Sequence, residues 1–320
     1  MPSLTELDAA AATVHAVFPP TAQLSWPLLS RRAGAKVWVK HENHTPIGAF
    51  KVRGGLVYLA ELKRAEPKVT GVISATRGNH GQSLAFAARR VGLTATLVVP
   101  HGNSVEKNAA MRALGGELVE NGKDFDEAYG HARQLAGDRR LHLVLAFHPW
   151  LVRGVASYGL ELLRAVPDLD TVYVPIGQGS GICGTIAARD ALNLRTRIVG
   201  VVAQNAPAYA LSLQRGEPVA TDSATTIADG VACRIPDPQA FELIRHGAER
   251  IVTVSEAEIR AAMGHYFTDT HNVAEGAGAA PLAAILQERD RMRGRKVGLV
   301  LSGGNVDRAV YASVLAEADG

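Results

Sequence analysis

Short runs of apolar residues alternate with alanine- and leucine-rich stretches along most of the 320 residues. The runs cover residues 36–42, 69–75, 93–100, 141–147, 171–177, 196–204 and 296–304. A strand that is apolar at nearly every position needs a cover on both faces, as in a parallel sheet between two layers of helices. Stretches such as "NHGQSLAFAARRVG" and "GICGTIAARDALN" between the runs have a helical pattern. The alternation therefore predicts an α/β fold with parallel sheets.

The composition restricts the classes of protein to which this chain can belong. Hydrophobic residues make up 47% and charged residues 20%, as in a folded globular protein. The net charge of +3 is scattered along the chain, so we expect no nucleic-acid partner. No run approaches the ~18 apolar residues of a membrane span, and the acidic, amphipathic start is unlike a signal peptide. Because Cys183 and Cys233 are distant and form no disulfide framework, we expect a cytoplasmic protein.

A glycine-rich turn, "PIGQGSGICG", follows the predicted strand at 171–177. Gly177, Gly179 and Gly181 permit close approach of the backbone, and the N–H groups of the following helix point at the turn. The turn is therefore a candidate phosphate site. An ordinary strand–helix connection would explain the same residues. A dinucleotide is disfavoured, because the spacing is not G-x-G-x-x-G and no acidic residue ends the next strand.

Three further segments place chemically useful side chains at turns. Lys51 lies next to Phe50 among the glycines of "HENHTPIGAFKVRGG", where it is a candidate reagent rather than a solvated helix lysine. Asn79 and His80 start a predicted helix in "TRGNHGQSLAFAA", either as a helix cap or as donors to a carboxylate or phenolic oxygen. Ser302 ends a strand in "LSGGNVD", where a tight turn is the simpler interpretation.

Together, these four segments resemble the fold-type-II family of pyridoxal-phosphate enzymes, and most closely its serine/threonine dehydratase branch, which includes serine racemase. The motifs occur in order, and weaker matches add "KNAAMRALGGELV", "TIADGVA" and "EGAGAAPLAA". The resemblance implies two parallel-sheet α/β domains with pyridoxal 5'-phosphate in the cleft between them. We expect residues 1–69 and 150–320 to form the larger, cofactor-binding domain and residues 70–149 the smaller, inserted one.

The resemblance also assigns residues to the cofactor. Lys51 matches the lysine that binds the cofactor covalently, Asn79 the asparagine at its phenolic oxygen, and Ser302 the residue that faces the pyridine nitrogen. A neutral hydroxyl in that place leaves the ring largely unprotonated, which suits the loss of a β leaving group. The other matching positions are Phe50 against the ring, Gly177, Gln178, Gly179, Ser180 and Gly181 around the phosphate, and Gly230 and Glu275 beside the ring.

The implied activity is a β-elimination, catalysed by a lyase of the dehydratase or ammonia-lyase type. A 3-hydroxy amino acid such as threonine or serine would give a 2-oxo acid and ammonia, with Lys51 as covalent anchor and general base. The loop formed by Thr76, Arg77, Gly78 and His80 would hold the carboxylate of the substrate.

Arg77 departs from the family pattern, since the racemase and many dehydratases have serine or alanine there. An arginine is almost always protonated and is a poor base, so racemisation is not expected as the main activity. Arg77 either points into solvent or clamps a carboxylate, which keeps open bulkier or acidic substrates such as phenylserine or 3-hydroxyaspartate. The residues are also compatible with a β-replacement synthase or racemase of the same fold, and with a non-catalytic protein that binds an amino acid or nucleotide.

The resemblance bears on metals and partners as well. The divalent-cation site of the family uses acidic residues that the segment "QNAPAYALSLQRG" lacks, so we expect no metal site. The family often forms dimers. The predicted partners are therefore a small-molecule amino acid and a second copy of this chain.

Overall fold

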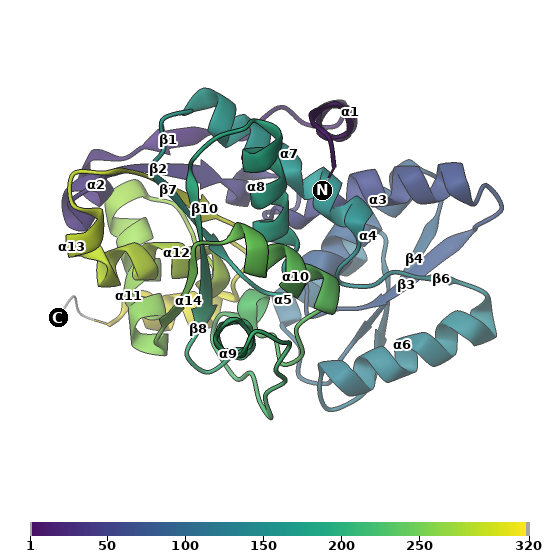
Figure 1. Cartoon of the computed structure of the whole chain (residues 1–320). Helices are drawn as coiled ribbons and strands as arrows, with labels where there is room; N and C mark the ends of the chain where they lie inside the picture. Colours follow the sequence, from purple (N-terminus) through teal and green to yellow (C-terminus); the bar gives the residue numbers. More distant parts are fainter. Residues whose placement is uncertain (1, 318–320) are drawn as a thin grey trace.

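Two sheets organise the computed structural model, which describes residues 2–317 (Figure 1). The strands are β1 (Gln23–Ser25), β2 (Lys36–His41), β3 (Gly71–Ala75), β4 (Thr94–Val99), β5 (Glu117–Glu120), β6 (His142–Leu143), β7 (Thr171–Pro175), β8 (Arg197–Ala203), β9 (Arg250–Val254) and β10 (Lys296–Leu301). The α-helices are α1 (Leu4–His15), α2 (Pro27–Ala33), α3 (Lys51–Ala65), α4 (Asn79–Arg90), α5 (Val105–Ala113), α6 (Phe125–Arg139), α7 (Pro149–Ala165), α8 (Ser180–Ala191), α9 (Ala208–Arg215), α10 (Pro238–Gly247), α11 (Glu256–Thr270), α12 (Gly276–Gln287), α13 (Arg289–Met292) and α14 (Arg308–Leu315). Two 3-10 turns are η1 (Glu42–His44) and η2 (Asp229–Val231).

The larger sheet has six strands in the order β1-β2-β10-β7-β8-β9, and the smaller has four in the order β5-β4-β3-β6. Neighbouring strands are parallel except β1, which runs antiparallel to β2. All four strands of the smaller sheet lie between β2 and β7 in the chain. The prediction of an α/β fold with two parallel sheets is therefore confirmed.

The larger sheet is apolar on both faces because successive residues of its inner strands point into different cores. In β8, Val199 and Val201 pack on one side in a core shared with α2, α11 and α12. Ile198 and Val202 pack on the other side in a core shared with α7, α8 and α10. A strand covered in this way needs apolar side chains at every position, which explains the continuous apolar runs in the sequence.

The smaller sheet lies on the right of Figure 1, with α3 and α4 against one face and α6 against the other. Val72 of β3 shares a core with Leu59 of α3, and Ile73 of the same strand packs with Ala128 of α6. One of its covering helices, α3, therefore precedes the segment that forms the sheet. We propose that residues 70–149 are the inserted domain and that α3 and α7 connect it to the larger sheet.

Residues 141–147 form less strand than the sequence predicts. Only His142 and Leu143 pair, with Val72 and Ile73 of β3. The prediction is wrong beyond Leu143, because the chain then leaves the sheet. The unpredicted strands β1, β5 and β9 and the truncated β6 all lie at sheet edges, where burial demands fewer apolar residues.

Several helices begin at clear local signals. Ser3 and Glu6 form a reciprocal capping box at the start of α1, and Ser255 and Glu258 form another at α11. Proline stands in the first turn of α2, α7 and α10, where its missing N–H costs no hydrogen bond. Within residues 2–317 no helix combines the length and hydropathy needed to cross a membrane.

Candidate active site

Lys51 is the first residue of α3 and follows Phe50, the N-cap. The Phe50 N–H donates to the carbonyl of Ser302, at the end of β10, over 2.9 Å. The Lys51 ammonium donates to Ser180 Oγ, in the glycine turn after β7, over 3.4 Å. The candidate site therefore lies at the carboxyl ends of parallel strands, where open sheets form their ligand sites.

Arg53 anchors this helix start. It is fully buried and forms ion pairs with Glu42 and Glu161, each at 2.6 Å. The buried ammonium of Lys40 contacts Glu161 at 2.5 Å. Because buried charges are tolerated only with compensating partners, this network holds the first turn of α3 in one place.

Burial lowers the pKa of Lys51 to about 8, although the carboxylate of Glu275 acts in the opposite direction. About a tenth of such an amine is neutral at pH 7, compared with less than about one part in a thousand for an ordinary lysine. The neutral amine is the nucleophilic and basic form. The surroundings of Lys51 therefore suit both attack on a carbonyl carbon and proton transfer.

The glycine turn between β7 and α8 forms a cradle of backbone groups. Gly179 has a φ of 96° and precedes Ser180, where α8 begins without a side-chain cap. A Cβ at Gly177 would lie 2.2 Å from the carbonyl oxygen of Gly230, and one at Gly179 would lie 2.8 Å from Ala240 Cβ. The turn therefore requires glycine at both positions. Uncapped N–H groups at a helix start favour an anion there.

Tyr158 links the glycine turn to Phe50. Its hydroxyl donates to the Gly181 carbonyl over 2.7 Å and accepts from Thr185 Oγ1 over 3.0 Å. Its ring meets the Phe50 ring edge-on, with 6.0 Å between the centroids. A Cβ at Gly181 would lie 3.6 Å from the Phe50 ring. Phe50 and the turn therefore form one continuous wall.

Asn79 joins a polar network instead of capping its helix. Its Nδ2 donates to Glu275 Oε1 over 2.8 Å, and its Oδ1 accepts from Asn305 Nδ2 over 2.8 Å. Burial raises the pKa of Glu275 to about 7, and the ammonium of Lys107 acts against this rise. The orientation of the Asn79 amide is therefore set by Glu275 and Asn305.

Ser302 is buried at the end of β10. The next residue, Gly303, connects Ser302 to the network of Asn79 and Glu275, because its carbonyl accepts the Glu275 N–H over 3.1 Å. A Cβ at Gly303 would lie 2.5 Å from Glu275 Oε1. Ser302 and Glu275 are thus neighbouring parts of one site.

Thr76 shapes the loop after β3. Its buried Oγ1 accepts the N–H groups of Gly78 and Gly81, each over 3.0 Å. Arg77 lies exposed on this loop, and no hydrogen bond or ion pair with any of residues 2–317 holds its side chain. The loop is therefore fixed, whereas Arg77 is available to a ligand.

His80 follows Asn79 in α4 and is buried. Its Nε2 has no hydrogen-bond partner in the described part of the chain. Burial, reinforced by the charge of Lys51, lowers its pKa to about 3, so the ring is neutral near pH 7. A neutral imidazole with an unsatisfied nitrogen can donate to, or accept from, a bound polar group.

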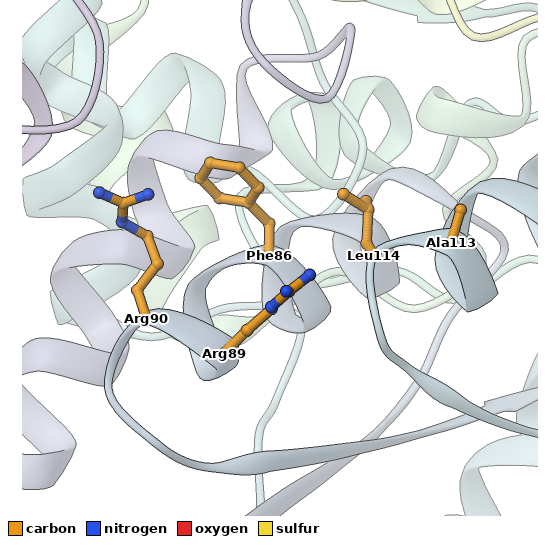
Figure 2. Close-up of a pocket in the computed structure, with 5 residues that line it drawn as sticks. All are labelled: Phe86, Arg89, Arg90, Ala113 and Leu114. Atoms are coloured by element: carbon orange, nitrogen blue, oxygen red, sulfur yellow. The ribbon is translucent and has the colours of Figure 1, made fainter.

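Two surface hollows lie apart from these residues. Figure 2 shows the first, of about 510 Å³, which is lined by Phe86, Arg89, Arg90, Ala113 and Leu114. It lies at the end of α4 opposite to Asn79, and a helix of 12 residues is about 18 Å long. The second, of about 780 Å³, lies between α1, the start of α7 and α10. Neither hollow includes Lys51 or the glycine turn.

The structure brings together the residues that the sequence predicted around ring and phosphate. They are Phe50, Lys51, Asn79, Gly177, Gln178 (whose carbonyl accepts from Tyr209), Gly179, Ser180, Gly181, Gly230, Glu275 and Ser302. Their contacts with a cofactor stay predictions. Sequence reasoning missed Lys107 and Asp229, although each lies in a weaker family match, "KNAAMRALGGELV" and "TIADGVA".

The described residues contain no group of three or more His, Cys, Asp or Glu side chains that could hold a metal ion. Independence from metals stays a prediction of the sequence. Activity assayed after dialysis against EDTA is expected to equal that of the untreated enzyme. A loss that added magnesium or calcium restores would contradict it.

The residues present fit pyridoxal phosphate. The glycine cradle and the uncapped start of α8 suit the phosphate. The buried Nε2 of His80 accepts or donates no hydrogen bond within residues 2–317 and can meet a polar group of a ligand. Lys51, with its lowered pKa, suits a covalent bond to the aldehyde.

Comparison with known proteins agrees with this geometry. Residues 17–303 match the family described as "Pyridoxal-phosphate dependent enzyme". The L-threonine ammonia-lyase of Thermotoga maritima is 35% identical over 308 residues, which cover 96% of this chain and 76% of that protein.

Among solved structures, maize serine racemase superposes with a TM-score of 0.91 at 26% identity, covering 97% of this chain and 96% of that one. The processed form of threonine deaminase isoform 2 from Solanum lycopersicum has a TM-score of 0.89 at 30% identity, covering 99% and 95%. The chain therefore belongs to the family of pyridoxal-phosphate-dependent enzymes, with the fold-type-II arrangement of two parallel sheets.

Proposed function

We propose that this enzyme is an ammonia-lyase that converts a 3-hydroxy amino acid, with threonine and serine foremost, to a 2-oxo acid and ammonia. The observation that carries the proposal is the position of Lys51, a half-buried amine of lowered pKa that faces the glycine cradle. The names of related proteins support the substrate class, since L-threonine ammonia-lyases cover most of this chain.

The cofactor, when bound, withdraws electrons from the α-carbon of the substrate. The neutral amine of Lys51 would take up the α-proton of the substrate as general base. Loss of the β-hydroxyl as water consumes one proton, which balances the α-proton that Lys51 has taken up. The unsaturated amino acid that is released hydrolyses in water to the 2-oxo acid and ammonia, so that no oxidant or reductant is consumed.

The loop from Thr76 to His80 holds the substrate in this proposal. Because Thr76 Oγ1 fixes the N–H groups of Gly78 and Gly81, the loop is rigid before a ligand arrives. The neutral His80 ring offers its unsatisfied Nε2 beside Lys51. A rigid set of donors binds a carboxylate without a further cost of ordering the loop.

The test is the release of ammonia and 2-oxo acid from a panel of 3-hydroxy amino acids, in all stereoisomers. Threonine or serine is expected to give stoichiometric amounts of both products. If sulfide is added, a β-replacement synthase would form a sulfur-containing amino acid in place of ammonia. Chiral chromatography of the remaining amino acid would detect racemisation. A protein that binds the cofactor but releases no ammonia from any member of the panel would refute the proposal.

The reactivity of Lys51 toward the cofactor is expected to follow its lowered pKa. Below pH 8 the amine is mostly protonated, so the rate of covalent capture by apoenzyme should rise about tenfold per pH unit and then level off near pH 8. Stopped-flow absorbance after mixing apoenzyme with pyridoxal phosphate measures this rate. A rate that still climbs above pH 9, as for an ordinary lysine, would contradict the assignment.

Arg77 is proposed to select the substrate by binding a carboxylate. Its exposure on a rigid loop supports this role and favours acidic 3-hydroxy amino acids, such as 3-hydroxyaspartate, as a second substrate class. Arg77→Ala is expected to raise the KM for the preferred substrate about tenfold or more, the scale of one charged hydrogen bond. Arg133→Ala, at an exposed arginine of α6, is the matched control. An unchanged KM in Arg77→Ala would dispose of the idea.

We also propose that the enzyme acts as a homodimer in the cytoplasm. Leu28, Phe267 and Leu315 are large exposed apolar side chains on α2, α11 and α14, and α11 contacts both other helices. Light scattering coupled to gel filtration measures the mass, and Phe267→Glu is expected to yield monomers.

The proposed location in the cytoplasm is supported by the cysteines. Both are buried and free, which suits a reducing compartment.

A further inference from the structure

Lys107 is a buried lysine that the family resemblance leaves without a role. It lies on α5, beside the smaller sheet, and its side chain is 7% exposed. Its ammonium contacts Asp229 Oδ2 at 2.6 Å and Glu275 Oε2 at 3.6 Å. Asp229 lies in η2 and Glu275 directly precedes α12, so both acids belong to the part of the chain around the larger sheet. Lys107 therefore bridges the two sheets.

The stem of the same side chain supports the loop after β3. A Cβ at Gly78 would lie 2.4 Å from Lys107 Cδ and 3.1 Å from its Cβ. Gly78 has a φ of 155°, and its N–H is held by Thr76. Because the stem fills the space beneath this loop, a shorter side chain would leave the loop without support.

The charged end of Lys107 acts on the side chains expected at the cofactor ring. Glu275 Oε1 accepts from Asn79, and the Glu275 N–H donates to the carbonyl of Gly303, next to Ser302. Glu275 Oε2 accepts no hydrogen bond in the described residues, so the nearby ammonium compensates this oxygen. Burial alone would lower the pKa of Lys107, but Glu275 and Asp229 outweigh burial and raise it, so the lysine stays charged.

We propose that Lys107 is a positioning residue for the cofactor: it joins the two sheets and, through Glu275 and Gly78, holds Asn79 and the substrate loop in their binding arrangement. The inference concerns the cofactor site of the family and does not depend on which substrate is used. Lys107 does not need to touch cofactor or substrate in this role.

The test measures the affinity of apoenzyme for pyridoxal phosphate by fluorescence titration, without substrate. Lys107→Met is expected to raise the Kd about tenfold, because an anchored donor network loses its ionic partner. Lys107→Arg keeps the charge and is expected to recover most of the affinity. With the preferred amino acid, the KM of Lys107→Met should rise more than its kcat falls, since the loop and not the base is disturbed.

Arg234→Gln is the matched control, because Arg234 forms an exposed ion pair with Asp126 at 2.7 Å that links α6 to the segment after η2. It should leave the Kd unchanged, since exposed pairs contribute little. Should Lys107→Met fail to fold, Lys107→Met combined with Asp229→Asn takes its place, because it removes the carboxylate that loses its partner at 2.6 Å and leaves Glu275 unchanged. A wild-type Kd in whichever of these two variants folds, even with a lowered Tm, overturns the proposal and leaves Lys107 a purely structural residue.

Discussion

Lys51→Ala is expected to lower the rate of ammonia release from threonine by at least about a thousandfold, because the variant loses its general base and covalent anchor together. The effect should fall on kcat, since the cradle and the loop that bind cofactor and substrate remain. The loss of the yellow, covalently bound cofactor should accompany it. Absorbance of the purified variant before and after borohydride treatment measures the bond, and a coupled assay of 2-oxo acid measures the rate.

Lys63→Ala is the control, since Lys63 lies in the last turn of the same helix and, within residues 2–317, donates only to the carbonyls of Pro67 and Val69. It is expected to keep the colour and rate of the parent enzyme. If the Lys51→Ala variant is coloured and sensitive to borohydride, another lysine must form the covalent bond. Lys107 and Lys40 would then need testing, because they are the buried lysines of the described chain.

Gly179→Ala is expected to raise the Kd for pyridoxal phosphate about a hundredfold, the effect of losing one or two charged hydrogen bonds. A side chain at a φ of 96° is strained, and its Cβ would also lie 2.8 Å from Ala240 Cβ. The turn must therefore shift, and the N–H groups at the start of α8 shift with it. The free energy of unfolding of the apoenzyme should fall by about 2–4 kcal/mol from strain and overpacking.

Gly216→Ala is the control that separates backbone strain from overpacking. Gly216 has a comparable φ of 79°, but a Cβ there would meet nothing within 4 Å. In this control the free energy of unfolding is expected to fall by about 1–2 kcal/mol, from the strain of the left-handed backbone alone. The Kd for pyridoxal phosphate is expected to stay unchanged. Urea unfolding and fluorescence titration measure both quantities. Equal values of Kd for the two variants would argue against the phosphate cradle.

Much of the site could be predicted because its signals are local. Lys51, Asn79, Ser302 and the turn from Gly177 to Gly181 each lie in a short motif where a strand end meets a helix start or a turn. Glycine at Gly179 is a requirement of local backbone geometry, and such requirements are visible in a sequence. The roles of these residues toward the cofactor are predictions that the variants above test.

Lys107 could not be assigned from the sequence, because its partner Asp229 lies 122 residues away. The buried Arg53 is similar, since its partner Glu161 lies 108 residues away. A charged residue in a helix usually faces solvent, and only the contacts made in three dimensions distinguish the exceptions. The edge strand β5 was also missed, because its sequence ELVE has few apolar residues and an edge needs few.

The α/β class and the family follow from the sequence alone, and the sequence predicts the reactive lysine, because strand burial, turn geometry and motif order depend on neighbouring residues. The exposure of Arg77, the contact by which Glu275 orients Asn79, and the bridge that Lys107 forms between the two sheets are visible only in three dimensions. The reason is physical: burial and charge compensation depend on distances between segments that the chain brings together only when both sheets have formed.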